Sequence, residues 1–162
     1  MEIDVREATL DDQQVRALAL DHVTQMRAGS PPGQAFALDL TGLDDPAITL
    51  FGAWRGDELL GIGALKRLGA EGAEIKSMRT ASDWLRRGVG DAMMRHLLGQ
   101  AEVLAFSRLS LETGSAPAYA PARRLYARHG FVACGPFADY VADPHSQFMT
   151  RRLDAAGPSL TG

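Results

Sequence analysis

The sequence MRTASDWLRRGVGDAMM, residues 78–94, decides how the rest of this chain is interpreted. It begins in a predicted strand, passes through a short polar connection, and reaches RRGVG at 86–90 where a helical pattern of apolar residues starts. A helix leaves its first backbone N–H groups without intrahelical acceptors and carries partial positive charge there, so glycines at that end let a phosphate reach the bare amides. The two arginines add forked donors for phosphate oxygens. We therefore predict an anion site, in particular one for a diphosphate.

A purely structural interpretation of 86–90 competes with this prediction. Glycines often precede helices, an Arg-Arg pair often forms only a solvated corner, and a single Gly-x-Gly match is weak. The chain has neither the Gly-x-x-x-x-Gly-Lys-Ser/Thr phosphate loop nor the third glycine of a dinucleotide fingerprint. The stretch by itself leaves both interpretations open.

The composition is that of one ordinary globular domain. The chain has 162 residues, of which 46% are hydrophobic and 23% charged, and these values argue against a disordered or fibrous protein. A chain of this length can bury a sizeable core, so we expect a single domain over residues 1–153 and a loose tail over 154–162. The net charge of −3 offers no basic field for nucleic acid or an anionic membrane, so the Arg-Arg pair is a local feature.

Cysteine usage and the N-terminal segment predict a cytoplasmic protein without a metal. Cys134 is the sole cysteine and cannot form an internal disulfide, and no Cys/His cluster has zinc-ligand spacing. The N-terminus is acidic where a secretion signal would be basic, and no apolar run is long enough to cross a bilayer. A nucleophilic Cys134 stays an alternative, although cysteine is more often a small buried hydrophobe.

Hydrophobic periodicity predicts strands and helices in alternation. Thr9, with Asp12 three residues later, predicts a capped helix start, and Gly29 with the prolines after it ends that helix. The predicted strands are 3–8, 48–54, 59–65, 73–80, 108–112, 131–134 and 147–153. The predicted helices are 9–29, a poorer segment at 35–43, 88–105 and 121–129.

The strand, helix and strand around 78–94 decide the sheet topology. A right-handed crossover through the helix at 88–105 places strand 73–80 parallel to strand 109–113. The turn at 55–57 and the candidate turn at 68–72 make the preceding strands an antiparallel meander. The last two strands form a hairpin with a long connection, which gives a mixed α/β sheet.

This order of elements resembles the GNAT family of N-acetyltransferases over residues 3–153. Members of that family carry a Gln/Arg-x-x-Gly-x-Gly/Ala loop, and this chain has LRRGVG at 85–90, with Leu85 departing from the first position. A second signature, Leu-Tyr followed by Gly-Phe, is present in RLYARHGF at 124–131. Two signatures in the right order at the right separation are far less expected by chance than either alone, and they favour this fold.

The resemblance implies the GNAT fold, with a mixed and mostly antiparallel sheet, a splayed parallel pair of fourth and fifth strands, and helices on both faces. It also implies acetyl-CoA as the cosubstrate and no metal. The end of strand 73–80 would bond the pantetheine arm through its backbone, and the loop would bind the diphosphate. The residues assigned to the cofactor are Met78, Arg79, Thr80, Arg86, Arg87, Gly88, Val89, Gly90, Asp91, Tyr119 and Arg123.

The chemistry of acetyl transfer selects three catalytic candidates. The acceptor amine must lose a proton before it attacks, because a primary amine titrates near 10. Glu74, where many family members hold a glutamate base, is our first candidate and Glu112 the second, acting directly or through water; either could instead only pair with Lys76 or an arginine. Tyr126 would protonate or hydrogen-bond the leaving thiolate, or be only a core aromatic.

We expect a stand-alone bacterial-type N-acetyltransferase acting on a primary amine of a small molecule or amino acid in a ternary complex. A protein lysine or N-terminus stays open as the acceptor, as do a non-catalytic coenzyme A-binding regulatory module and an interaction domain. The expected partners are acetyl-CoA and an amine, with no nucleic acid and no membrane, and a homodimer is left open. The residues expected at the acceptor mouth are Asp139, Tyr140, Asp143 and His145. His22 and His145 fit surface positions better than catalytic ones.

Overall fold

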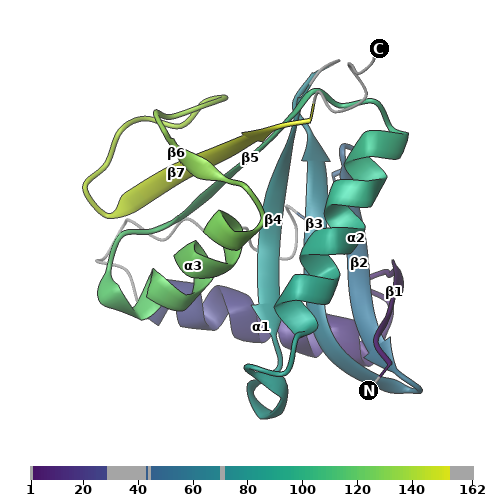
Figure 1. Cartoon of the computed structure of the whole chain (residues 1–162). Helices are drawn as coiled ribbons and strands as arrows, with labels where there is room; N and C mark the ends of the chain where they lie inside the picture. Colours follow the sequence, from purple (N-terminus) through teal and green to yellow (C-terminus); the bar gives the residue numbers. More distant parts are fainter. Residues whose placement is uncertain (1, 29–42, 44, 70–71, 154–162) are drawn as a thin grey trace. The chain divides into compact units, whose positions relative to one another are not determined.

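The computed structural model describes residues 2–28, 43, 45–69 and 72–153, without the side chains of 25–28. Its strands form one seven-stranded sheet in the order β1-β2-β3-β4-β5-β7-β6 (Figure 1). The strands are β1 (Asp4–Glu7), β2 (Ile48–Arg55), β3 (Glu58–Arg67), β4 (Gly72–Thr80), β5 (Arg108–Gly114), β6 (Val132–Cys134) and β7 (Ser146–Arg152). The α-helices in the described part are α1 (Gln13–Ala28), α2 (Val89–Val103) and α3 (Ala120–Arg128).

The chain divides into two compact units. Unit 1 comprises residues 1–66 and 76–97, and unit 2 comprises residues 67–75 and 98–162. The boundary falls inside β4 and inside α2, so both elements contribute to both units. Each unit has its own buried side chains and its own candidate site residues, and each is described separately below.

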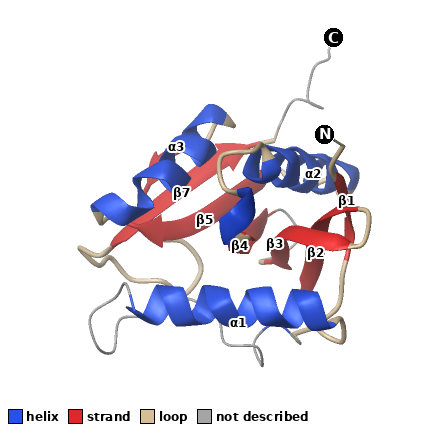
Figure 2. Cartoon of the chain, turned by 90° about the horizontal axis from the view of Figure 1, so that it is seen from below, coloured by secondary structure: helices blue, strands red, loops and turns tan. Residues whose placement is uncertain are grey.

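In unit 1, α1 and the start of α2 lie on opposite sides of β2 and β3 (Figure 2). Val15 and Ala19 of α1 pack with Leu50 and Ile62 of the sheet in one buried cluster. On the other face, Met93 of α2 lies where Gly63 has no side chain, since a Cβ there would stand 2.9 Å from its Cγ. Helices therefore cover both faces, as the resemblance implied.

The first helix begins later than the sequence pattern predicted. Its cap is Asp12, whose carboxylate accepts the N–H groups of Gln14 and Val15 at 2.8 and 3.1 Å. Thr9 instead accepts the N–H of Asp11 at 3.2 Å in the turn before the helix. Both residues are good acceptors for bare N–H groups, and the residue next to the apolar face supplies the cap.

In unit 2, β5 pairs with β4 on one side and with β7 on the other. The β4 pairing is parallel and runs from Gly72 opposite Arg108 to Ile75 opposite Leu111, as the crossover predicted. The β7 pairing is antiparallel and covers all of β5. β6 then pairs with β7, which confirms the predicted hairpin.

The course of β4 changes just beyond the residues that pair with β5. Ser77 has φ of 56°, in the left-handed region that residues with a Cβ seldom occupy. Its position is two residues beyond Ile75, the last β4 residue in the parallel register. Such a residue changes which way the following side chains point, because strand alternation is interrupted there.

Most predicted elements agree with the structure within two residues at each end, which is the usual uncertainty of helix and strand ends. The third strand of the meander, the crossover helix and the helix before His129 are confirmed. The helical segment predicted at 35–43 and the tail at 154–162 lie outside the described residues, Leu43 excepted. Among the described helices none is long and apolar enough to span a bilayer.

Candidate active site

The loop between β4 and α2, residues 81–88, has the local structure that its sequence requires. A short 3-10 helix, η2 (Ser82–Trp84), follows Ala81, and the N–H of Trp84 donates to the Ala81 carbonyl at 2.9 Å. Arg86 and Gly88 then take φ values of 60° and 87°. Gly88 bears that conformation without the steric cost a Cβ would add, which is the physical reason for a glycine at this entry.

Residue Trp84 anchors this loop in unit 1. Its ring is 7% exposed and its Nε1 donates to Glu58 Oε2 at 3.0 Å. The guanidinium carbons of Arg87 and Arg55 lie 5.0 and 5.6 Å from the ring centroid, close enough for cation–π attraction. The sequence pattern predicted a polar connection and missed this buried aromatic anchor.

The start of α2 presents the arrangement expected of an anion site. The first backbone bond of the helix runs from the N–H of Ala92 to the carbonyl of Gly88 at 3.0 Å. The amides of Val89 and Gly90 therefore precede the intrahelical ladder. Asp91 adds a carboxylate to the same turn, which favours the helix dipole but opposes an anionic ligand.

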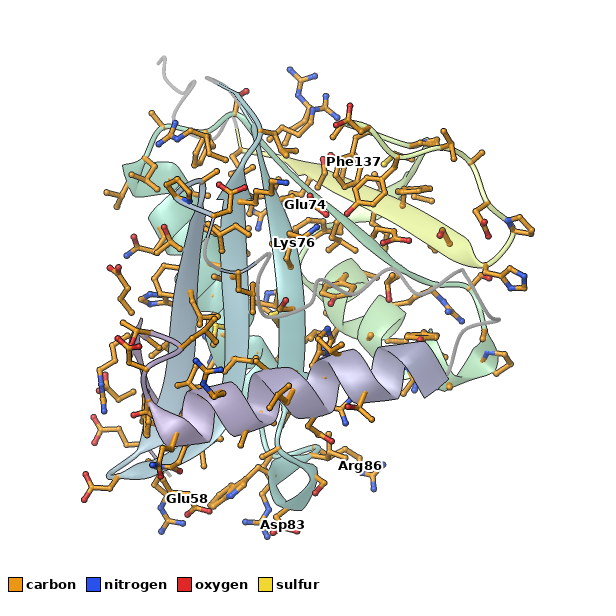
Figure 3. The ribbon with its side chains drawn as sticks, turned by 180° about the vertical axis from the view of Figure 1, so that it is seen from behind. Glu58, Glu74, Lys76, Asp83, Arg86 and Phe137 are labelled. Carbon is orange, nitrogen blue, oxygen red and sulfur yellow. The ribbon has the colours of Figure 1, made fainter. Side chains whose placement is uncertain are left out.

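The loop cations are exposed. Arg86 and Arg87 lie at the surface, and Arg86 extends away from the ribbon (Figure 3). Leu85, which replaces the polar first position of the family pattern, is 53% exposed. The two arginines and the helix amides thus form one continuous stretch of donors along the chain.

At the end of β4 the side chain of Arg79 has a partner of its own. Its Nε and Nη2 donate to Asp21 Oδ2 of α1 at 3.3 and 3.0 Å. Only the backbone of Met78, Arg79 and Thr80 was assigned to the pantetheine arm, so this ion pair is compatible with that assignment. The side chain serves the contact between α1 and β4.

Next to this pair, His22 corrects a sequence expectation. Burial, followed by the Arg79 charge, lowers the pKa of His22 to about 4, so its ring is neutral near pH 7. Its Nδ1 is buried and has no hydrogen-bond partner in the described part of the chain. His22 is therefore half-buried rather than fully at the surface, whereas His145 is exposed as predicted.

In unit 2 the two candidate bases each receive a hydroxyl. Glu74 is 3% exposed, and the hydroxyl of Tyr140 donates to its Oε2 at 2.6 Å. Glu112 is half-buried and accepts the Ser146 hydroxyl at 2.7 Å. We call these four residues the carboxylate cluster. Tyr140 was expected at the acceptor mouth, and its bond to Glu74 was not foreseen, because no local pattern links residues 66 positions apart.

Aromatic rings hold Tyr140 in place. Its ring centroid lies 5.1 Å from that of Phe137 and 5.6 Å from that of Phe148, and the two phenylalanines are 5.8 Å apart. Figure 3 shows Glu74 and Phe137 pointing into the same region of unit 2. The cluster is therefore built from β4, β5, β7 and the connection before β7.

Tyr126 lies in α3 with its ring 7% exposed and edge-on to Phe131 at 6.2 Å. Burial raises the pKa of Tyr126 to about 12, so its hydroxyl stays protonated at physiological pH. The two aromatic residues of the second signature thus pack together. This packing is that of a core aromatic residue, and the protonated hydroxyl is still able to donate a hydrogen bond.

The remaining assigned residues stabilise the segment between β5 and α3. Arg123 Nη1 donates to the carbonyls of Gly114 and Ala116 at 2.6 and 3.0 Å. The ring of Tyr119 occupies the place of a side chain at Gly114, because a Cβ there would lie 2.2 Å from a ring carbon. Cys134 is half-buried, and burial raises the pKa of its thiol, which disfavours the thiolate that a nucleophile needs.

Comparison with known proteins identifies the family of this chain. Residues 15–131 match the acetyltransferase (GNAT) family. The chain belongs to the GNAT family. It is therefore an acyl-CoA-dependent N-acyltransferase, and the small bacterial-type resemblance is confirmed by its relatives.

Three relatives align over most of this GNAT chain. YsnE of Bacillus subtilis, described as an uncharacterized N-acetyltransferase, is 49% identical over 144 residues, covering 89% of this chain and 95% of its own. YedL of Escherichia coli, described in the same way, is 46% identical and covers 86% and 87%. The IAA acetyltransferase of Azospirillum brasilense is 34% identical and covers 72% and 75%.

Solved structures show the same fold at lower identity. A Klebsiella pneumoniae structure assigned to the acyl-CoA N-acyltransferases has a TM-score of 0.78 at 23% identity, covering 93% of this chain and 97% of its own. A GNAT acetyltransferase from Elizabethkingia anophelis with acetyl-CoA bound has a TM-score of 0.69 at 17% identity, covering 93% and 98%. These similarities establish the GNAT fold.

Proposed function

We propose that this GNAT protein transfers the acetyl group of acetyl-CoA to a primary amine of a small molecule or amino acid, by direct attack within a ternary complex. The observation that carries the proposal is Glu74, a carboxylate buried to 3% exposure that accepts the Tyr140 hydroxyl. A buried carboxylate is unfavourable unless it is paired, and here it lies in a family whose reaction needs a base.

Acetyl-CoA as the donor is supported by the family and by the loop in unit 1. The GNAT acetyltransferase from Elizabethkingia anophelis, which has the same fold, was solved with acetyl-CoA bound. In this chain, Arg86, Arg87 and the amides of Val89 and Gly90 would bind the diphosphate, while backbone groups of 78–80 would bond the pantetheine amides. Tyr119 and Arg123 stay proposed acetyl-CoA contacts.

The proposed reaction starts with proton removal from the acceptor. Glu74 takes a proton from the attacking ammonium, directly or through water, and the nitrogen lone pair then forms a bond to the thioester carbonyl carbon. Glu112 is the alternative base, since Ser146 holds it in a comparable way. The nitrogen gives its remaining extra proton to solvent, the C–S bond breaks, and the electron pair of that bond leaves with the sulfur of coenzyme A.

The raised pKa of Tyr126 favours one of its two proposed roles. With a pKa of about 12, the phenol is a much weaker acid than an alkyl thiol, which titrates near 8.5. Full proton transfer from Tyr126 to the thiolate is therefore uphill by roughly 3.5 pKa units, on the order of 5 kcal/mol. We propose that Tyr126 stabilises the developing thiolate by donating a hydrogen bond, and that the proton comes from solvent.

The experiment that tests this function is an acetyl-CoA-dependent screen of amines. Free thiol release is measured with amino acids, polyamines, aromatic amines and IAA, because the Azospirillum relative is named for IAA, and products are confirmed by mass. Varying both substrates should give intersecting double-reciprocal lines, as a ternary complex requires, whereas parallel lines would indicate a covalent intermediate.

Three other results would replace the proposal. Turnover only with lysine-containing or N-terminal peptides would make the protein a protein acetyltransferase. Calorimetric binding of coenzyme A without turnover on any acceptor would indicate a regulatory module. No binding of coenzyme A would leave only an interaction domain.

A further inference from the structure

The connection between β6 and β7, residues 135–145, and the first residue of β7 together supply two hydroxyl groups that donate to the candidate bases. Tyr140 lies within the connection and bonds Glu74, and Ser146, the first residue of β7, bonds Glu112. The two candidate bases thus lie on β4 and β5, but the groups that orient them come from one later segment. This arrangement makes the connection part of the proton-handling machinery.

The Tyr140 side chain is held by a backbone turn and by two aromatic rings. The N–H of Tyr140 donates to the Phe137 carbonyl at 3.0 Å, which closes a tight turn. Its ring packs on Phe137 and on Phe148, and Phe148 is 4% exposed on β7. Aromatic pairs at such distances and tilted angles are favourable beyond their burial. The hydroxyl therefore has a fixed direction.

Tyr140 remains a hydrogen-bond donor at any working pH. Burial, the bond to Glu74 and the charges of Glu74 and Glu112 all raise its pKa far above that of an ordinary tyrosine. Both carboxylates lie on strands next to the connection, Glu74 on β4 and Glu112 on β5, and Lys76 follows Glu74 by two positions on β4. The phenol can neither compete as a base nor release its proton to Glu74.

We propose that Tyr140 is the positioning residue for Glu74, fixing the plane of the carboxylate so that it meets the acceptor amine in one orientation. This inference rests on the proposed function and adds a residue that the family signatures at 85–90 and 124–131 do not contain. Positioning matters because a misplacement of about 1 Å can cost roughly 10²-fold in rate. Glu74 is taken as the base, and Glu112, which accepts the Ser146 hydroxyl, stays the alternative.

The test is Tyr140→Phe, which keeps the ring and its packing and removes only the hydroxyl. We expect kcat with the best acceptor to fall about 10- to 100-fold, with KM for acetyl-CoA within about twofold of the parent. Because the hydroxyl donates to the carboxylate, its loss should also change the pH dependence of kcat, which the loss of packing alone would not do. Ser115→Ala is the matched control, because the Ser115 hydroxyl donates to the Pro144 carbonyl at 2.7 Å rather than to a carboxylate.

A double-mutant cycle separates positioning from a general structural effect. If Tyr140 acts through Glu74, adding Tyr140→Phe to Glu74→Gln should lower kcat by less than about twofold further. Fully additive losses, or an unchanged kcat and pH profile in Tyr140→Phe, would overturn the proposal. So would a shifted profile in Ser146→Ala with none in Tyr140→Phe, which would transfer the base to Glu112. Absence of turnover in the parent protein would instead remove the proposed function itself.

Discussion

The loop at 81–88 and the carboxylate cluster are two candidate parts of one reaction, but they are built in opposite ways. The loop is continuous in the chain, exposed, and rich in backbone donors, with φ values of 60° and 87° at Arg86 and Gly88. The cluster is centred on the buried Glu74, has half-buried partners, and joins Glu74 to Tyr140, 66 positions later. A phosphate can be held by a local motif, whereas a buried base needs partners that only the fold can bring.

The difference predicts different responses to mutation. Loss of one donor from an exposed loop leaves other donors and water to compensate, so binding should weaken by degrees. Loss of a group in the carboxylate cluster leaves a partner unsatisfied and removes a chemical function. The changes below run from the largest expected effect to the smallest.

Glu74→Gln should have the largest effect, because it keeps the size and removes the base. We expect kcat to fall about 10²- to 10⁴-fold while the Kd for coenzyme A stays within about twofold. The acid limb of the pH–rate profile should disappear or move. Glu112→Gln is the comparison, and an equal or larger loss there would assign the base to β5.

Arg86→Ala with Arg87→Ala should weaken coenzyme A binding by roughly 10²-fold at low salt, because charge-assisted bonds to phosphate are lost. The difference from the parent should shrink as ionic strength rises. Calorimetry at several salt concentrations measures the Kd for coenzyme A in the variant and in the parent. Arg95→Ala, which removes an exposed arginine of α2, is the control, and equal losses in the two variants would disprove a diphosphate site in the loop.

Tyr126→Phe should lower kcat by about 10- to 30-fold without weakening coenzyme A binding, since one hydrogen bond to a developing charge is removed. Burial raises the pKa of Tyr126 to about 12, so its hydroxyl should stay protonated until the pH approaches that value. Deprotonation of Tyr126 should therefore not lower the activity of the parent protein below that pH. A decline in kcat near pH 8 that is present in the parent and absent in the variant would contradict that pKa. Unchanged turnover would leave Tyr126 a packing residue.

Trp84→Phe should weaken coenzyme A binding by only a few-fold, because it removes the Nε1 bond to Glu58 and reduces the ring surface beneath Arg87. This change tests whether the exposed loop depends on its one buried anchor. Trp54→Phe is the control, since the Nε1 of Trp54 has no hydrogen-bond partner in the described part of unit 1. Equal binding in both variants would show that the anchor is dispensable.

Gly88→Ala should have the smallest effect, a loss of about 1 kcal/mol in the free energy of unfolding, because its φ is 87°. Gly99→Ala should instead raise stability by up to about 1 kcal/mol, since Gly99 lies inside α2 with open space where a Cβ would be added. Urea unfolding of both variants checks the pair. Equal effects would show that the Gly88 conformation is not required.

The sequence by itself determined the elements whose signals are local. The alternation of 48–54 and 59–65, the turn between them, and the periodic Val89, Met93 and Leu97 predicted β2, β3 and α2 closely. The order strand, helix, strand predicted the parallel pairing of β4 with β5, because crossover connections have one hand. Glu74, Tyr126 and the loop were nominated through signatures that are short and contiguous.

Only the tertiary structure decided which side chains act on one another. The bond of Tyr140 to Glu74, the burial of Trp84 against Glu58 and Arg87, and the neutral state of His22 all depend on how the chain folds back on itself. The physical reason is that periodicity and capping are properties of neighbouring residues, whereas burial and hydrogen-bond partners depend on where the chain returns. A sequence can therefore nominate a base, but the fold determines what holds it.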